Sequence, residues 1–284
     1  MSRSADPVSA ALPRPWERPV PVAIVSIGAL TLVGWAILLV EAIRRGGGAD
    51  AFLEALCTPA AVLEAPSLAG ALSALGISVA MWIAMSVAMM LPTASALLVG
   101  YAEKAEAART AGSPAVSPML VGAGYLAVWV VLSILVALLQ TGVSIAFASA
   151  DLPDRLAGVL GGAALGAAGL YQFTAFKLSC LVAIGAPFRA RPEGWLASPR
   201  AVFRLGLEQG VRCVGCCWAM MAVLVVLGAM NLVWMAVFSA IMAAEKLAAT
   251  PRAAKIVGAG LLAAGLALSL DAVGLAPIVA YLGR

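Results

Sequence analysis

Histidine is absent from this 284-residue chain. The absence excludes haem held by histidine, copper centres built on histidine, a Ser-His-Asp triad and a zinc-protease motif, because each needs at least one imidazole. We find no set of base, nucleophile and orienting partner in this sequence. We therefore expect the protein not to be an enzyme.

Charged residues are also scarce: they make up 11% of the chain, while 63% of its residues are hydrophobic. A soluble domain has about a quarter of its residues charged, so this chain cannot cover a water-exposed surface. Runs of about 20 apolar residues, the length that crosses a bilayer as a helix, recur along it. The composition predicts an all-α, polytopic transmembrane helical bundle in contact with the lipid bilayer. The net charge of +4 reports orientation in the membrane and gives no indication of a nucleic-acid partner.

The apolar runs divide the chain into a tail and one membrane domain. Residues 1–19 are rich in Pro, Ser and Arg and are expected to be a disordered tail, whereas residues 20–284 should form a single transmembrane domain. Single spans are predicted at 20–40, 68–91, 119–140, 156–173 and 256–282. A tract at 211–247 is too long for one span, and a turn in its GAMN sequence at 228–231 would divide it into two. The prediction is about seven spans, with six possible.

Basic residues orient these spans, because Lys and Arg collect in short cytoplasmic loops. The connection 177–212 carries six of them, and we place it inside together with the tail and the loop 103–109. This orientation places Arg44 and Arg45 outside, contrary to the rule. The pattern predicts a multi-pass protein of the bacterial inner (cytoplasmic) membrane with a cytoplasmic N-terminus.

Small residues recur in two of the spans, in AGVLGGAALGAAGL at 157–170 and in GAGLLAAGLALSL at 258–270. Small side chains let helix backbones approach closely in lipid. We expect both segments to be helix-packing faces and not ligand sites.

Methionine is concentrated in two places, since eight of the eleven methionines lie at 81–90 and 220–235. In MWIAMSVAMMLP, which starts at Met81, the four-residue spacing of Met81, Met85 and Met89 places their thioethers along one helix face. Pro92 should kink or end that helix. A single methionine is ordinarily flexible core filler, but the clustering favours a soft-metal site.

Three of the five cysteines form C-x-x-C-C at Cys213, Cys216 and Cys217. On a helix these thiols share a face, which Met220 continues one turn further. Thiolates and thioethers suit Cu(I), while thiolates alone also suit zinc or an iron–sulfur cluster. Structural zinc usually takes four protein ligands, and only one C-x-x-C pair is present. The alternative is plain packing, since cysteine behaves as a small hydrophobe in helix contacts.

The predicted topology brings sulfur from three helices to one membrane depth. Met89 lies near the inner end of the second span, Cys180 near the inner end of the fourth, and Cys213 at the inner start of the fifth. The candidate metal ligands are Cys213, Cys216, Cys217, Cys180, Met81, Met85, Met89 and Met220. Asp271 falls within the last predicted span, too far toward the middle of the membrane to be a ligand.

Four segments resemble a known family: MWIAMSVAMMLP, GLYQFTAFKLSCL, FRLGLEQGVRCVGCCWAMM and MNLVWMAVFSAIMAAEK. They are similar to bacterial predicted metal-binding integral membrane proteins, one of which serves as a copper chaperone for a tyrosinase-type polyphenol oxidase. The resemblance covers about residues 80–247 and is most specific at 210–221. It implies copper bound by Cys180 and the three clustered cysteines, with methionines of the second span. The chain departs from the family at Gln209, usually histidine, and at Ile184, usually cysteine.

Two functions remain open at this point. The first is copper handling, in which the protein binds Cu(I) through cysteine and methionine sulfur and delivers it to a cuproenzyme. The second is a non-catalytic, auxiliary helical subunit of a larger membrane protein complex, in which the sulfur residues only pack. A transporter has less support, because only Pro92 suggests the broken helices that transporters use.

Overall fold

The structure is a computed structural model, and it describes residues 19–44, 67–147, 154–189, 191–226, 232–248 and 251–274. No strand occurs within these ranges, which confirms the predicted all-α fold. The elements are α1 (Pro19–Arg44), α4 (Leu68–Thr93), α5 (Ser95–Thr110), α6 (Pro118–Phe147), α7 (Asp154–Tyr171), α8 (Ala175–Gly185), the short 3₁₀ helix η2 (Trp195–Ala197), α9 (Pro199–Val226), α10 (Leu232–Ala248) and α11 (Pro251–Ala272). Most of the predicted tail lies outside the described residues.

Five of the described helices, α1, α4, α6, α9 and α11, are long and apolar enough to cross a membrane. A sixth span results if α7 and α8 count as one, although a bend of 58° separates them. The predicted seven spans therefore exceed the number found, while the alternative of six is matched by counting the bent pair. The long tract does form two helices, α9 and α10, but α10 has only 17 residues. The predicted turn at 228–231 lies outside the described residues.

Two connections that the sequence analysis treated as loops are largely helical. The fifth span was expected to begin at residue 211, whereas α9 begins at Pro199. The region 103–109 likewise belongs to α5. Charged side chains can remain on a helix where they pair on its surface, as Glu208 does with Arg204 one turn earlier and with Arg191. The apolar run therefore marked only the second half of α9, which places the cysteine cluster near the middle of the helix.

The C-terminal helix also differs from its prediction. The span was placed at 256–282, but α11 begins at Pro251 and ends at Ala272. Asp271 consequently lies in the last turn of α11, where it is exposed, and not in the interior of a span. A charge at a helix end avoids the desolvation that a carboxylate would suffer in the middle of the membrane.

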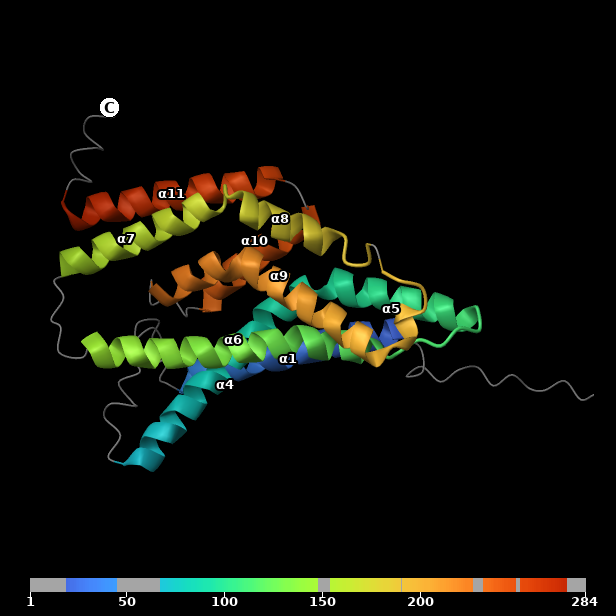
Figure 1. The fold of residues 1–284 in the computed structure, drawn as a ribbon. Helices are drawn as coiled ribbons and strands as arrows, with labels where there is room; N and C mark the ends of the chain where they lie inside the picture. The colour runs from blue at the N-terminus through green and yellow to red at the C-terminus, as the bar shows by residue number, and fades with distance from the viewer. Residues whose placement is uncertain are drawn as a thin grey trace, which may run out of the picture.

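The two glycine-rich segments pack against each other, as α7 and α11 lie side by side in Figure 1. A methyl group added to Gly162 would overlap with Ser269, and one added to Gly169 would lie 2.9 Å from the Gly258 carbonyl oxygen. Gly265 is equally close to α7, with 2.8 Å between its added methyl and the nitrogen of Gly166. The prediction that both segments are helix-packing faces is confirmed.

A second close contact joins α6 to α9 and positions the candidate site. Gly124 of α6 faces Gly206 of α9, and a methyl group on either would overlap with a backbone carbonyl of the other helix. One turn further along α9, a methyl added to Gly210 would lie 2.9 Å from the Val128 side chain. The close approach brings Tyr125 of α6 against Cys213 of α9, where the two side chains form a hydrogen bond.

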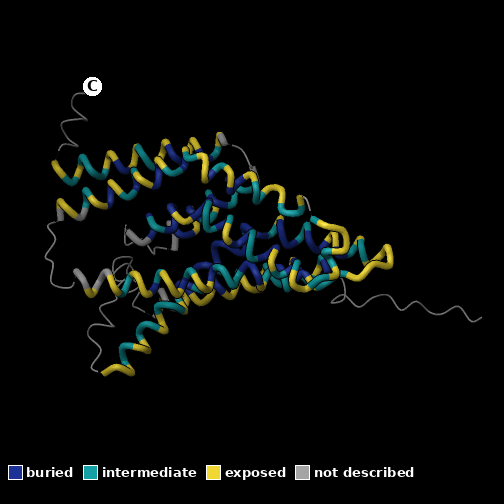
Figure 2. The backbone as a smooth tube through the Cα atoms, in the orientation of Figure 1, coloured by how far each residue is buried: buried dark blue, intermediate teal, exposed yellow. Residues whose placement is uncertain are grey.

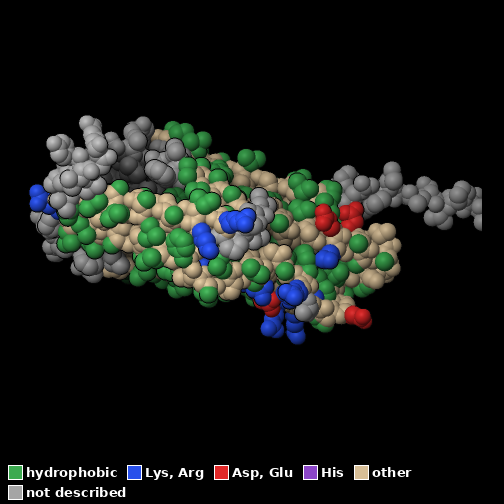
Figure 3. Space-filling model, turned by 90° about the horizontal axis from the view of Figure 1, so that it is seen from above, with side chains coloured by type: hydrophobic (Ala, Val, Ile, Leu, Met, Phe, Trp, Pro, Cys, Tyr) green, Lys and Arg blue, Asp and Glu red, His purple; other side chains and the backbone are tan. Residues whose placement is uncertain are grey.

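Large apolar side chains remain exposed along the outer helices, including Val25 and Leu32 of α1 and Leu139 of α6. The buried core runs between α4, α6, α9 and α10, as the dark blue segments of Figure 2 show. On the face shown in Figure 3, the Lys, Arg, Asp and Glu side chains lie mostly in the middle and toward one end of the molecule, and few lie at the other end. This distribution suits a bundle with a lipid-facing flank and a water-facing end.

Contacts of α5 stabilise the end of the bundle where η2 lies. Tyr101 of α5 donates a hydrogen bond of 3.0 Å to the carbonyl of Val116 and packs edge-on against Trp195. Burial raises the pKa of Tyr101 to about 12, against the opposing effect of the Arg109 charge. The phenol therefore keeps its proton, and the hydrogen bond, throughout the neutral range.

Candidate metal centre

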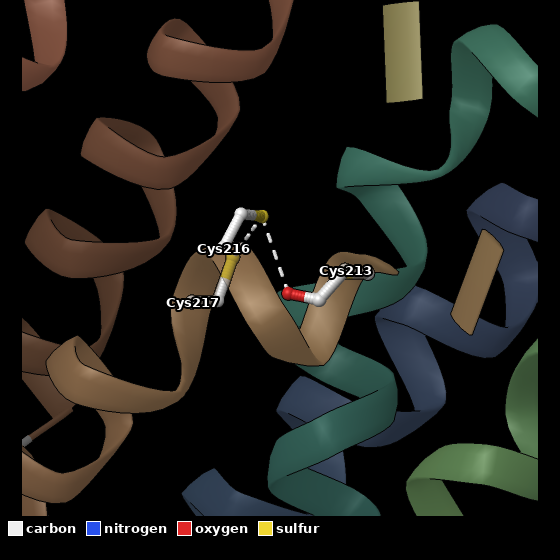
Figure 4. A group of neighbouring side chains, drawn as sticks. All are labelled: Cys213, Cys216 and Cys217. Carbon is white, nitrogen blue, oxygen red and sulfur yellow. Dashed lines mark hydrogen bonds between the residues drawn. The ribbon is translucent and has the colours of Figure 1, made fainter. Parts of the chain in front are cut away.

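Three thiols gather on one face of α9. The Sγ atoms of Cys213, Cys216 and Cys217 lie within 4.8 Å of one another, and all three side chains are buried. Figure 4 shows Cys216 between the other two: its Sγ lies 3.2 Å from the Cys213 carbonyl oxygen and 3.1 Å from the Cys217 Sγ. Positions i, i+3 and i+4 fall on one face of an α-helix, so the spacing alone produces this cluster. The four described cysteines are free thiols.

Side chains from two other helices contact the Cys213 sulfur. The Tyr125 hydroxyl of α6 lies 3.0 Å from Cys213 Sγ, and the Lys246 ammonium of α10 donates to the same sulfur at 3.0 Å. Lys246 also donates to the Thr93 hydroxyl of α4 at 2.6 Å. Four helices therefore meet at Cys213, and a positive charge lies directly beside a sulfur that can act as a metal ligand.

The methionine-rich helix α4 ends next to this cluster. Pro92 lies in its last turn and the helix ends at Thr93, as the sequence predicted. The Met90 carbonyl accepts a hydrogen bond of 3.1 Å from Tyr125, the residue that also contacts Cys213. The Met89 carbonyl accepts from Ser239 of α10 at 3.4 Å. The end of α4 is thus tied to both α6 and α10 beside the cysteines.

The predicted methionine ligands differ in burial. Met85 and Met89 are buried in the same core as the three thiols, and Met81 packs against that core while partly exposed. Met220, also buried, follows Cys213 by seven residues on α9 and so lies on nearly the same face of the helix. The structure places all four beside or within one sulfur-rich core, and their role as ligands stays a prediction.

Cys180 occupies a different side of α9. A methyl group added to Gly215 would lie 2.8 Å from Cys180 Sγ, so the thiol packs against the backbone at that position. Gly215 lies about 200° around the helix from Cys213. Tyr171 borders the same side, donating to the Gly215 carbonyl. Cys180 is therefore not a member of the group of thiols within 4.8 Å of one another, and its part in metal binding also stays a prediction.

A cavity of about 370 Å³ reaches the cluster at Cys213. Cys213 is the one thiol of the three that lines it, together with Thr93, Tyr125 and Lys246. Gln209 lines it as well; this side chain is only 2% exposed, and its Nε2 has no hydrogen-bond partner. The cavity therefore combines a thiol, an ammonium group and an unsatisfied amide.

A family model described as PpoB2, copper chaperone, matches residues 79–268, more than half of the chain. The chain belongs to the PpoB2 copper chaperone family. The matched range contains the region 80–247 on which the sequence resemblance rested and extends it through most of α11. No curated protein and no solved structure shows a significant match to the chain.

The donor set fits the copper of a PpoB2 family member. Three buried sulfurs from one helix offer the soft ligands that Cu(I) prefers, and two or three such ligands are enough for this ion. Three thiolates around Cu(I) would carry two net negative charges, and Lys246 at 3.0 Å from Cys213 offsets part of that charge. The hydrogen bond from Tyr125 orients the same sulfur.

The two positions at which this PpoB2 family member departs from the expected pattern both lie at the cavity. Gln209 and Ile184 line it together with Cys213. Neither position is one of the three thiols. The departures therefore change the lining of the cavity next to Cys213 and leave the three cysteines in place.

Several residues around the PpoB2 site were missed by sequence reasoning. Tyr125, Thr93 and Lys246 carry no local motif, and each comes from a different helix. The buried ion pair of 2.7 Å between Lys177 and Glu245 was not predicted either. One signal was available: lysine and glutamate are rare in an apolar tract unless they are paired or functional, and the tract ends in Glu245 and Lys246.

Proposed function

We propose that this protein is an integral membrane copper chaperone that binds Cu(I) through cysteine sulfur and delivers it to a cuproenzyme. The observation that carries the proposal is the buried group of Cys213, Cys216 and Cys217, in a chain that belongs to a copper chaperone family. The role is non-catalytic, because the protein transfers an ion and does not change a covalent substrate. Copper is thus the cargo of the protein and not its cofactor. It is held as Cu(I), the state that thiolates favour.

The methionines extend this proposal, whereas Cys180 lies apart from the group of three thiols. Met220 lies one turn from Cys216 and Cys217 on α9, and Met85 and Met89 border the same core. Thioethers bind Cu(I) without carrying charge, which suits them to hold the ion briefly within an apolar bundle. We assign Met81, Met85, Met89 and Met220 as accessory donors, and Cys180 as a separate thiol on the far side of α9.

The five apolar helices and the bent pair support a membrane setting. We propose the bacterial inner membrane, with the N-terminus and the charged end of the bundle facing the cytoplasm, where Lys and Arg accumulate. The recipient is a copper enzyme that meets the protein at this membrane. Transfer needs little reorganisation of the ion, because two-coordinate and three-coordinate sulfur sites interconvert readily.

Metal analysis of the purified protein tests the proposal. We expect about one copper per chain after anaerobic purification in detergent, since three thiols form one site. The double variant Cys213→Ser with Cys216→Ser should lose it, because a serine hydroxyl is a hard donor. Cys180→Ser is the matched control and should retain most of the copper.

Two results would contradict the proposal. One is a wild-type protein that binds no Cu(I) under anaerobic conditions yet still supports the activity of its partner oxidase. The other is constant stoichiometric copurification with other membrane polypeptides and no bound metal, which the auxiliary-subunit alternative predicts.

A further inference from the structure

The cavity beside Cys213 has a buried inner end and an exposed opening. Ala96 of α5 and Gly185 of α8 line it and are exposed, so they mark the opening. Cys213 and Gln209 line it and are buried, so they mark the inner end. Its volume of about 370 Å³ falls in the range of small-molecule sites, about 300–1,000 Å³. The cavity therefore has room for more than a bare metal ion.

Only one of the three clustered thiols is reachable from this side. Cys213 lines the cavity, whereas Cys216 and Cys217 do not. Any ion that arrives through the cavity meets Cys213 first. The unpartnered Gln209 Nε2 is a hydrogen-bond donor that a ligand oxygen or sulfur would satisfy.

The charge at the inner end selects the form in which copper can arrive. The Lys246 ammonium lies between Cys213 Sγ and Thr93 Oγ1, at 3.0 and 2.6 Å. Among the described residues, no carboxylate lines the cavity. A bare or neutral-ligand Cu(I) cation would be repelled by the ammonium, while a Cu(I) ion carried by two thiolates is an anion and would be attracted.

We propose that this cavity is the exchange port of the chaperone and that it accepts Cu(I) in a thiolate complex, with Cys213 as the first ligand and Lys246 as the residue that positions the anionic complex. The inference rests on the proposed function. It adds the form in which the cargo arrives and the path by which it reaches the cluster.

The step is a ligand exchange with no change of oxidation state. The Cys213 sulfur forms a bond to Cu(I), and one bond between Cu(I) and a carrier thiolate breaks. The departing thiolate takes up the proton that Cys213 releases, or leaves as the anion if Cys213 is already ionised. Cys216 then displaces the second carrier thiolate in the same way, and the ion is held on α9 by two sulfurs with Cys217 beside it.

Filling the opening tests the path. Ala96→Trp places a large side chain at the exposed opening, and Ala107→Trp, also exposed on α5, is the matched control away from the cavity. Stopped-flow transfer of Cu(I) from its glutathione complex should slow at least about tenfold in Ala96→Trp, with copper stoichiometry unchanged. Labelling of Cys213 by N-ethylmaleimide, read by mass spectrometry on metal-free protein, should slow in the same variant.

Charge removal tests the form of the cargo. Lys246→Gln should lower the ratio of transfer rates between the anionic glutathione complex and the cationic acetonitrile complex of Cu(I) by about tenfold. Lys255→Gln, an exposed lysine of α11, should leave the ratio unchanged. A purely structural role of Lys246 would alter both rates alike. In a parallel series, a synthetic C-x-x-C peptide loaded with Cu(I) replaces glutathione. The carrier that transfers Cu(I) to the protein faster identifies the thiolate source.

The outcomes separate the two proposals. Wild-type protein without any bound Cu(I) refutes the proposed function and this inference with it. Normal copper binding with equal transfer rates in Ala96→Trp and Ala107→Trp refutes the exchange port alone. An unchanged rate ratio in Lys246→Gln refutes the selection of an anionic complex.

Discussion

At the scale of single residues, the Tyr125 hydroxyl joins the thiol cluster to the end of α4 through its contacts with Cys213 Sγ and the Met90 carbonyl. We predict that Tyr125→Phe weakens Cu(I) binding about tenfold, the usual effect of removing a hydrogen bond that orients a metal ligand. Competition with a Cu(I) chelator measures it. Tyr171→Phe is the control, because Tyr171 bonds to the Gly215 carbonyl on the other side of α9. Equal losses in both variants would contradict the assignment.

The ion pair between Lys177 and Glu245 is almost fully buried, with side chains 1% and 4% exposed. Gln172 also accepts a hydrogen bond from Lys177. Lys177→Met should destabilise the protein by roughly 3–5 kcal/mol, because it leaves a buried carboxylate without its cation. Thermal unfolding in detergent measures the change.

Two further variants check this explanation. Adding Glu245→Met should restore much of the lost stability, since no unpaired charge then remains. Arg204→Met breaks an ion pair in which the arginine is 79% exposed, and it should cost less than about 1 kcal/mol. A double variant as unstable as Lys177→Met would show that packing, and not the charge, accounts for the effect.

At the scale of helices, the contact between α6 and α9 sets the geometry of the site. Gly206→Ala should destabilise the bundle by about 1–3 kcal/mol, because the new methyl overlaps with the Val121 carbonyl and the helices must separate. Copper affinity should fall with it, since Tyr125 moves with α6. Gly142→Ala is the control: no atom lies within 4 Å of the added methyl. Unchanged thermal stability in Gly206→Ala would show that the helices are not in such close contact.

At the scale of the whole molecule, the arrangement in Figure 1 predicts which connections share a side of the membrane. Single cysteines replacing Glu106, Glu193 and Lys255 should be protected together from an impermeant thiol reagent in intact cells. A cysteine replacing Arg155, at the start of α7, should react. The cysteine-free background requires the five native cysteines to be replaced by alanine. Labelling of Glu106→Cys and Arg155→Cys from the same side would contradict the topology.

Local spacing was enough to predict part of the site. Cys213, Cys216 and Cys217 share a helix face whatever surrounds them, because α-helical geometry fixes positions i, i+3 and i+4. The end of α4 at Pro92 and the mutual packing of the glycine-rich helices were equally accessible, since each depends on a property of nearby residues. The first residue of α9 could not be predicted in this way, because surface ion pairs such as that between Arg204 and Glu208 let the helix extend beyond its apolar run.

The sequence by itself determined the helical class, the family resemblance and the three-thiol cluster, because composition and helical periodicity act over short distances along the chain. Only the tertiary structure decided what surrounds Cys213. Tyr125, Thr93 and Lys246 come from helices far apart in the sequence. The close approach of α6 and α9 brings Tyr125 to the Cys213 sulfur, and α10 brings Lys246. Cys180 likewise depends on tertiary packing: α8 places it against the backbone at Gly215, about 200° around α9 from Cys213, because helix packing and not chain spacing sets which side chains of different helices meet.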